Sequence, residues 1–208
     1  MTLAIADLVA CWPASSFLEP TEPPWRVVAE APGRVRAALG LLDAGYAIEG
    51  DIAIHRTAAV EAGAVIKGPA IIGPGCLVAA GAYLRGGVFL DRDCVVGPGS
   101  ELKSSLVFAG SKLAHFNFVG DSILGSGVNL EAGAVIANYR NERADKTIRI
   151  LLDGRIVDTG VEKFGALVGD GARIGANAVV APGAVLARSA IVPRLGLVDQ
   201  SPPDRNSA

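Results

Sequence analysis

The sequence predicts an all-β fold in which short strands wind into a parallel β-helix. Large apolar residues recur at every sixth position in an unbroken run, which is formed by Ile54, Val60, Ile66, Ile72, Val78, Leu84, Leu90, Val96, Leu102 and Phe108. Neither the 3.6-residue period of an α-helix nor the two-residue period of a strand explains this spacing. Most positions four places further on carry small residues, and 26 glycines supply tight corners. Three hexapeptides therefore predict one turn of a triangular prism, whose core forms when successive turns stack.

The chain before this repeat is different in kind. Residues 1–47 lack the six-residue spacing, contain several prolines and show a short helical pattern at Arg34–Leu42. The first turn of a β-helix has an open apolar end that needs cover. We therefore expect residues 1–47 to form a short, partly helical N-terminal cap on a β-helix that spans residues 48–198.

The repeat loses its phase after Phe108. Leu124, Leu130 and Ile136 keep the six-residue step, but Leu124 lies 16 residues after Phe108. Because 16 is not a multiple of six, the spacing predicts an irregularity between residues 109 and 123.

A longer interruption follows Ile136, and the spacing returns only at Val168, Ile174, Val180 and Leu186. Residues 138–163 are therefore predicted to form an inserted loop. Within it, residues 148–157 have the pattern of a hairpin that turns at Asp153-Gly154. Residues 199–208 are rich in serine, proline and aspartate and are predicted to be a disordered tail.

Charge and cysteine content exclude several classes of protein. With 19 basic and 21 acidic residues the net charge is -2, so no basic field exists to attract nucleic acid. No apolar run approaches the roughly 20 residues that span a bilayer, and we expect a cytoplasmic protein without membrane partners. Cys11, Cys76 and Cys94 form no CxxC motif and indicate reduced thiols. Cys76 and Cys94, 18 residues apart, are expected to stack as small core residues.

The residues that carry chemistry gather near the loss of phase. They read KLAHFNFVGDS at residues 112–122, NLEAGA at 129–134 and NY at 138–139. This pattern resembles the acetyltransferase half of bacterial N-acetylglucosamine-1-phosphate uridyltransferase. It is more similar still to the C-terminal domain of archaeal bifunctional sugar-1-phosphate nucleotidylyltransferase/amino-sugar-1-phosphate acetyltransferases. That subfamily also resembles this chain in YLRG at 83–86, ELKSS at 101–105 and DTGVEKFG at 158–165, so the resemblance covers roughly residues 66–185.

The resemblance implies a left-handed β-helix, a homotrimer with each site shared between adjacent prisms, and acetyl-CoA as co-substrate without a metal. It assigns His115 as the general base, and a neutral imidazole suits this role near pH 7. Glu101 would orient that base, and the Ala132 N–H would hold the thioester oxygen, a contact worth about 3 kcal/mol in a transition state. The alternatives are a structural histidine at a coil corner and an ordinary exposed carboxylate.

The resemblance also implies two sets of binding residues. Arg85 and Lys103 would contact a sugar phosphate by charge-assisted bonds, with Lys146 as a third cation and Asn138 against the acceptor sugar. Acetyl-CoA is expected along the later coils, near Ala176 and Ala181. Each of these residues has an ordinary surface or corner role as its alternative.

Two residues depart from the family pattern. Phe118 stands where the family has a tyrosine that helps to bind the acceptor, and Glu131 stands where glycine is usual. Residues 1–50 contain no glycine-rich pyrophosphorylase loop, so nucleotide transfer is not expected. These departures leave a different acceptor or weak activity open.

The leading hypothesis is a CoA-dependent N-acetyltransferase that acts on an amino-sugar phosphate, such as glucosamine-1-phosphate or galactosamine-1-phosphate. His115 would take the proton of the attacking amine, with no covalent enzyme intermediate. The main alternative is a non-catalytic, regulatory β-helix that binds a sugar phosphate or sugar nucleotide. A purely structural solenoid is a third possibility. A zinc carbonic anhydrase of the same fold needs three histidines, and this chain has only His55 and His115.

Overall fold

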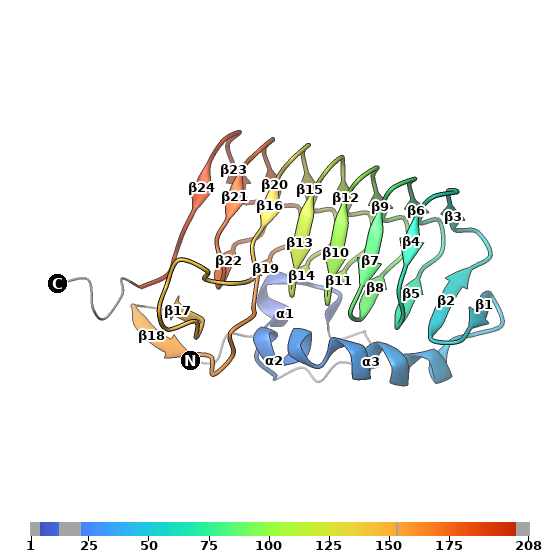
Figure 1. Cartoon of the computed structure of the whole chain (residues 1–208), viewed down its shortest axis with the longest axis horizontal. Helices are drawn as coiled ribbons and strands as arrows, with labels where there is room; N and C mark the ends of the chain where they lie inside the picture. Colours follow the sequence, from blue (N-terminus) through green and yellow to red (C-terminus); the bar gives the residue numbers. More distant parts are fainter. Residues whose placement is uncertain (1–4, 13–21, 153, 203–208) are drawn as a thin grey trace.

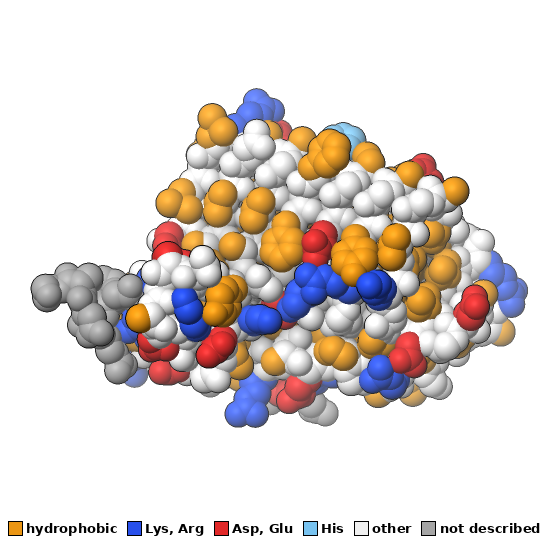
Figure 2. Space-filling model, in the orientation of Figure 1, with side chains coloured by type: hydrophobic (Ala, Val, Ile, Leu, Met, Phe, Trp, Pro, Cys, Tyr) orange, Lys and Arg blue, Asp and Glu red, His pale blue; other side chains and the backbone are white. Residues whose placement is uncertain are grey.

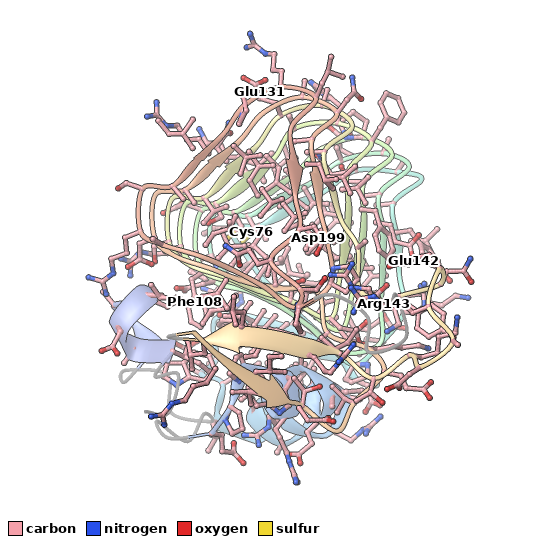
Figure 3. The ribbon with its side chains drawn as sticks, turned by 90° about the vertical axis from the view of Figure 1, so that its left-hand side faces the viewer. Cys76, Phe108, Glu131, Glu142, Arg143 and Asp199 are labelled. Carbon is pink, nitrogen blue, oxygen red and sulfur yellow. The ribbon has the colours of Figure 1, made fainter. Side chains whose placement is uncertain are left out.

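A computed structural model describes residues 5–12, 22–152 and 154–202. Its three main sheets form the sides of a triangular prism (Figures 1 and 3). Sheet A consists of β1 (Tyr46–Glu49), β2 (Ile52–His55), β5 (Ala70–Ile72), β8 (Val88–Leu90), β11 (Leu106–Val107), β14 (Ile123–Leu124), β19 (Ala166–Val168) and β22 (Ala184–Leu186). Sheet B consists of β3 (Ala59–Val60), β6 (Leu77–Val78), β9 (Val95–Val96), β12 (Lys112–Leu113), β15 (Asn129–Leu130), β20 (Arg173–Ile174) and β23 (Ile191–Val192).

Sheet C consists of β4 (Val65–Ile66), β7 (Tyr83–Arg85), β10 (Glu101–Lys103), β13 (Phe118–Gly120), β16 (Val135–Ile136), β21 (Val179–Val180) and β24 (Leu197–Val198). Successive strands within each sheet pair in parallel, except that β1 pairs antiparallel with β2. The predicted fold class, a left-handed parallel β-helix with a partly helical N-terminal segment, is confirmed.

The inside of the prism is filled by one apolar side chain from each strand. Leu84, Leu102 and Val119 occupy successive levels of sheet C, and all are fully buried. Cys76 and Cys94 lie in the same core as free thiols, as predicted. Stacking of these turns buries the apolar surface that a single turn would expose.

The loss of phase occurs at two corners, and the spacing predicts only the second of them. The inward residue of β11 is Val107, whereas Phe108 points outward and packs against Trp12, with ring centroids 6.0 Å apart. From Leu102 to Val107 and from Val119 to Leu124 the step is five residues instead of six. The irregularity is therefore one missing residue at each of two corners between sheets C and A.

Sheet A is apolar on both faces, because its inner face lines the prism and its outer face is covered by the N-terminal helices. α1 (Ile5–Leu8), α2 (Pro24–Ala29), α3 (Ala31–Ala38) and the 3-10 helix η2 (Leu39–Leu41) lie along it (Figure 1). Outward residues such as Ile71, Leu106 and Ile123 are fully buried in this second core. The sequence predicts instead a cap over the end of the first coil. The reason for the difference is the extra apolar side chain on each sheet A strand, which demands cover along the whole flank.

The insertion forms a hairpin, as predicted, from β17 (Arg149–Leu152) and β18 (Arg155–Asp158). Gly154 adopts φ +74 in its turn, while Asp153 lies outside the described residues. The first residues of the predicted disordered tail are ordered, because Asp199 binds Arg140 and the Gln200 side chain pairs with the backbone of Val185. Residues 203–208 lie outside the described residues.

Candidate active site

The predicted general base, His115, lies at the corner between sheets B and C and is exposed. Phe116 follows it with φ +52, a backbone conformation that turns the chain sharply, and its ring is 71% exposed. The Phe116 ring covers Gly99 of the preceding coil, where a Cβ would come within 2.5 Å of it. This corner therefore presents an imidazole and an aromatic ring side by side in the sequence, both open to solvent.

The backbone N–H groups at this corner of successive coils differ in whether they donate a hydrogen bond. Glu61 accepts a hydrogen bond from the Ala80 N–H at 2.8 Å, and Glu131 accepts one from the Ala176 N–H at 2.9 Å. In the part of the chain that the structure describes, the N–H groups of His115 and Ala132 donate no hydrogen bond. The residues that would reach them from the preceding coils are Gly97 and Ala114, which carry no acceptor. The predicted oxyanion donor, Ala132, is thus available.

The predicted phosphate contacts lie along the other edge of sheet C. Arg85 binds Glu101 at 2.6 Å and lies against the Tyr83 ring, 5.9 Å from its centroid. Lys103 Nζ donates to both carboxylate oxygens of Asp121, at 2.7 and 2.6 Å. Glu101 therefore partners a cation here, and both predicted phosphate cations already have a carboxylate.

Asn138 joins this cluster because its side-chain amide donates to Asp121. A Cβ on Gly120 would come within 2.7 Å of the Asn138 amide, so this close approach requires glycine. Lys103, Asp121 and Asn138 are stacked in successive coils at the corner between sheets C and A. A cavity of 460 Å³ opens beside Lys103 and Asp121.

The structure brings the predicted site residues to one face but not to one point. His115 lies at the corner before β13 and the Lys103 cluster lies at the corner after it, so the three extended residues of β13, about 10 Å of strand, separate the two. Phe118 lies between these two edges, in register with Glu101 and Val135. A ligand that touches both His115 and the Lys103 cluster must therefore lie across the outer face of sheet C.

The outer face of sheet C carries two rows of side chains (Figure 2). The first row is apolar apart from one acid and consists of Val65, Tyr83, Glu101, Phe118, Val135, Val179 and Leu197. We call it the outer column of sheet C. Lys67, Arg85 and Lys103 lie in the second row, nearer the corner with sheet A. An apolar row beside a basic row suits a ligand with both ring and phosphate surfaces.

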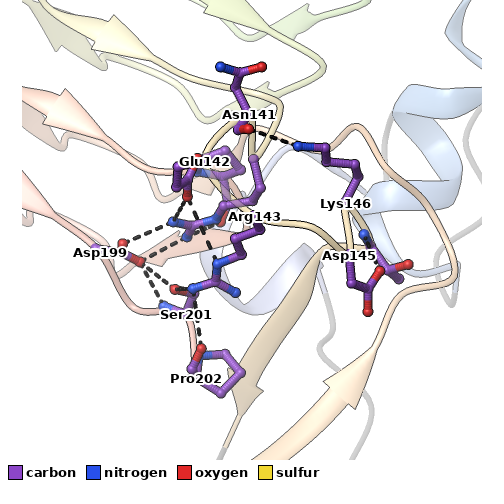
Figure 4. Close-up of polar contacts among 11 residues, drawn as sticks. Asn141, Glu142, Arg143, Asp145, Lys146, Asp199, Ser201 and Pro202 are labelled. Carbon is purple, nitrogen blue, oxygen red and sulfur yellow. Dashed lines mark hydrogen bonds and ion pairs between the residues drawn. The ribbon is translucent and has the colours of Figure 1, made fainter. Parts of the chain in front are cut away.

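Lys146 does not join the Lys103 cluster. Its Nζ donates to the Asn141 carbonyl at 2.7 Å and lies 5.6 Å from the Tyr139 ring centroid (Figure 4). The same loop is anchored by Arg140, which is 4% exposed and binds Asp199 at 2.8 Å. Arg140 is a structural residue that sequence reasoning missed, since its partner lies 59 residues away.

The predicted acetyl-CoA contacts are engaged within the chain. The Ala176 N–H is taken by Glu131, and the Ala181 N–H donates to the Val198 carbonyl at 2.8 Å. Glu131 stands at the apex of the prism and also binds Arg194 through both carboxylate oxygens (Figure 3). Arg194 and then the Ala176 amide hold the pKa of Glu131 below its usual range. The roles of Ala176 and Ala181 remain predictions.

The described residues contain no group of three or more histidine, cysteine or acidic side chains that could hold a metal ion. Among those residues, no helix has the length and apolar character needed to cross a membrane.

Asp121 is a residue of the site to which the sequence analysis assigned no role, although it accepts hydrogen bonds from Lys103 and Asn138. The sequence signal that could have identified Asp121 is the Gly-Asp pair at residues 120–121, which closes the motif at residues 112–122.

The chain is similar over about a third of its length to two curated bifunctional proteins. It is 37% identical over 68 residues to a bifunctional sugar-1-phosphate nucleotidylyltransferase/acetyltransferase of Sulfurisphaera tokodaii. It is 36% identical over 69 residues to the bifunctional protein GlmU of Methanococcus maripaludis. Each match covers 33% of this chain and 16% of the relative. The resemblance read from the motifs is confirmed, and this chain spans about a sixth of each relative's length.

Two solved structures are also similar. The acetyltransferase domain of PglB from Neisseria gonorrhoeae has a TM-score of 0.25 and 17% identity, and the match covers 73% of this chain and 51% of that one. PerB from Caulobacter crescentus, in complex with CoA and GDP-perosamine, has a TM-score of 0.24 and 18% identity, with coverages of 70% and 52%. No protein-family model matches the chain.

Proposed function

We propose that this protein is an acyltransferase that moves the acetyl group of acetyl-CoA to the amine of an amino-sugar phosphate. One observation carries the proposal. The exposed imidazole of His115 lies one coil before the Ala132 N–H, which makes no hydrogen bond with the described residues. The equivalent corner position in the coil before His115 is Pro98, which has no N–H, and that in the coil after Ala132 is Ala176, whose N–H is bonded to Glu131. Acyl transfer to an amine uses a general base for the amine proton and a hydrogen-bond donor for the oxyanion, and these two groups can supply both.

The reaction would be direct. His115 removes a proton from the acceptor amine as its nitrogen attacks the thioester carbonyl. The Ala132 N–H donates to the oxyanion that forms, and CoA leaves as a thiolate that is then protonated. Cys76 and Cys94 are buried in the prism, and Cys11 contacts Ser126 Oγ away from the corner that carries His115, so the proposed transfer uses no thiol nucleophile.

The acceptor would lie across sheet C, with its amine toward His115 and its phosphate toward the second row of side chains. Phe118 would supply an apolar surface under the sugar ring, and Asn138 and Lys103 would contact the polar end. We further propose a homotrimer in which the outer column of sheet C faces a neighbouring prism. Glucosamine-1-phosphate and galactosamine-1-phosphate are the first acceptors to test.

A thiol-release assay with acetyl-CoA and a panel of amino-sugar phosphates tests this function. The wild type is expected to release thiol with at least one acceptor, and His115→Ala is expected to lose at least ~100-fold in kcat. His55→Ala is the matched control, because His55 contacts Thr57 and the Tyr46 ring on sheet A. Absence of thiol release with every acceptor, combined with binding of a sugar phosphate, would instead support a non-catalytic binding protein.

A further inference from the structure

Asn117 is a buried polar residue two positions after His115, at the corner where the chain enters β13. Its side chain is 2% exposed. Before most other strands of sheet C, the equivalent position carries alanine, as at Ala64, Ala134 and Ala178. Burial of an amide without partners is costly, so an asparagine at a position that alanine fills elsewhere needs hydrogen bonds.

The Asn117 side chain finds these hydrogen bonds on both neighbouring coils. Its amide nitrogen donates to the backbone carbonyl of Glu131 at 2.7 Å and to that of Ala134 at 3.2 Å. Its amide oxygen accepts from the Ser100 hydroxyl at 3.5 Å. Because carbonyl oxygens can only accept, the amide nitrogen must face Glu131 and Ala134. Asn117 therefore spans both ends of the turn at residues 131–134, which contains Ala132.

One of these two carbonyls belongs to the peptide group that carries the proposed oxyanion donor. The Glu131 carbonyl and the Ala132 N–H form one planar trans peptide, in which the two groups point in opposite directions. Since the carbonyl points toward the buried Asn117, the Ala132 N–H points away from the prism. A hydrogen bond to the carbonyl also polarises the N–H of the same peptide and makes it a stronger donor.

The chain contains a matched turn without this contact. Residues 61–64 have the same sequence as residues 131–134, EAGA. The Glu61 carbonyl accepts the Ala64 N–H at 3.1 Å, and the Glu131 carbonyl accepts the Ala134 N–H at 3.2 Å. Among the residues that the structure describes, no side chain donates to the Glu61 carbonyl. The backbone bond alone therefore suffices to form the turn, and the Asn117 bond is an addition at the coil of the proposed site.

We propose that Asn117 is a positioning residue for acyl transfer, which holds the Ala132 peptide with its N–H directed at the oxyanion. The inference rests on the proposed function, because it assigns a role within the same reaction. His115 is tied to the same turn, since the Gly133 N–H donates to the His115 carbonyl at 2.9 Å. Together the two contacts fix the base and the oxyanion donor relative to each other.

Substitution of Asn117 by alanine and by serine tests this role. Asn117→Ala places at this corner the residue that other coils carry, so it is expected to fold while it loses the side-chain bond to Glu131. Serine has a precedent in this fold, because the Ser111 hydroxyl donates at 2.7 Å to the Gly125 carbonyl, which is 14 residues further on, as Glu131 is from Asn117. Asn117→Ser is therefore expected to keep a donor on the Glu131 carbonyl.

Steady-state thiol release is the first measurement. Asn117→Ala is expected to lower kcat about 10-fold with the KM of both substrates unchanged, because the N–H contacts the transition state rather than the bound substrates. Asn117→Ser is expected to retain most of the wild-type kcat. Ser111→Ala is the control, since it removes the equivalent bond at the corner between sheets A and B and is expected to leave kcat unchanged. Circular dichroism and thermal melting of each variant show that the fold is retained.

A spectroscopic measurement reads the peptide without any turnover. Isotope labelling of glutamate carbonyl carbons and alanine nitrogens selects the three Glu-Ala peptides of the chain, whose N–H groups belong to Ala31, Ala62 and Ala132. In Asn117→Ala the Ala132 amide resonance is expected to move upfield, because its peptide loses a polarising hydrogen bond. The Ala62 resonance, from the matched turn, is expected to stay in place, and Asn117→Ser is expected to restore the Ala132 resonance toward its wild-type position.

The two measurements separate this inference from the proposed function. A lowered kcat in Asn117→Ala that serine restores, together with a shifted Ala132 resonance, supports the positioning role. A kcat equal to that of the wild type overturns the positioning role and leaves the proposed function intact. If the wild type releases no thiol, the proposed function fails, and the resonance still decides whether Asn117 orients the Ala132 peptide. An unmoved Ala132 resonance in Asn117→Ala overturns the assignment in either case.

Discussion

At the scale of single residues, Glu131 has the largest consequence for the proposed acyl donor. It stands where the resemblance leads us to expect glycine, and its carboxylate occupies the Ala176 N–H at 2.9 Å. Ala176 is the next corner position after Ala132, so a donor tail that continues along this edge would meet an amide that is already bonded. Arg194 holds the carboxylate there through two contacts of 2.8 and 2.9 Å.

We predict that Glu131→Gly lowers the KM for acetyl-CoA about 3-fold to 10-fold, with little change in kcat. The freed Ala176 N–H would bond to the donor instead, and a neutral hydrogen bond is worth about 0.5–1.5 kcal/mol net. Steady-state kinetics with the acceptor at saturation measures this change. Glu61→Gly is the control, because Glu61 occupies the Ala80 N–H in the same way four coils earlier. An unchanged KM in Glu131→Gly would show that the donor does not use the Ala176 amide.

At the scale of elements, the insertion is joined to the last coil by a short polar network (Figure 4). Arg140 binds Asp199 through two nitrogens, and Arg143 binds Ser201 at 2.7 Å. The Arg140 hydrogen bonds hold the pKa of Asp199 well below its usual range. This contact fixes the loop that carries Tyr139 and Lys146 and leads to β17.

We predict that Asp199→Asn lowers the free energy of unfolding by about 1–2 kcal/mol at pH 7. The loss leaves the buried Arg140 guanidinium without its charge partner, and the partial exposure of Asp199 keeps the cost below that of a fully buried pair. Urea unfolding followed by circular dichroism measures it. Glu142→Gln is the matched control, since Glu142 is 61% exposed and 3.3 Å from Arg140. An equal loss in both variants would contradict a specific role for Asp199.

The same pair sets a dependence on pH. Because the pKa of Asp199 is lower in the folded than in the unfolded chain, its stabilisation is present above the unfolded value of about 3.9. It disappears as pH falls from there through the folded pKa. The difference in stability between wild type and Asp199→Asn is therefore expected to shrink below about pH 4.

Elements show what the sequence could predict and what it could not. The six-residue spacing, the insertion and its hairpin are encoded by local patterns, and each is present in the structure. The first change of phase was missed because Val107 and Phe108 are both apolar, and only packing against Trp12 shows which of them points outward. The cluster of Lys103, Asp121 and Asn138 could not be predicted either, because its members are 17 or 18 residues apart and meet only when the coils stack.

At the scale of the whole molecule, the three sheets of the prism differ in how they are covered. Sheet A is buried beneath the N-terminal helices, with Trp25 against Phe164 and Trp12 against Phe108. The outer column of sheet C remains open, and Val65, Val179 and Leu197 are 45%, 39% and 71% exposed. A row of this kind, apolar except for Glu101, on a rigid surface is typical of a protein interface. Association of prisms is therefore expected through sheet C and its corner with sheet B.

We predict that the protein is a homotrimer, with a mass by light scattering of three times the 21.2 kDa chain. Val179→Glu places a charge in the outer column of sheet C, between Val135 and Leu197, so it is expected to give monomers and to abolish thiol release together. Ile156→Glu is the control, because Ile156 is 54% exposed on β18, beyond the covered flank of sheet A. It is expected to leave both the mass and the activity unchanged. If the wild type is a monomer at micromolar concentration and still releases thiol, the site is complete within one chain, and the outer column of sheet C has another partner.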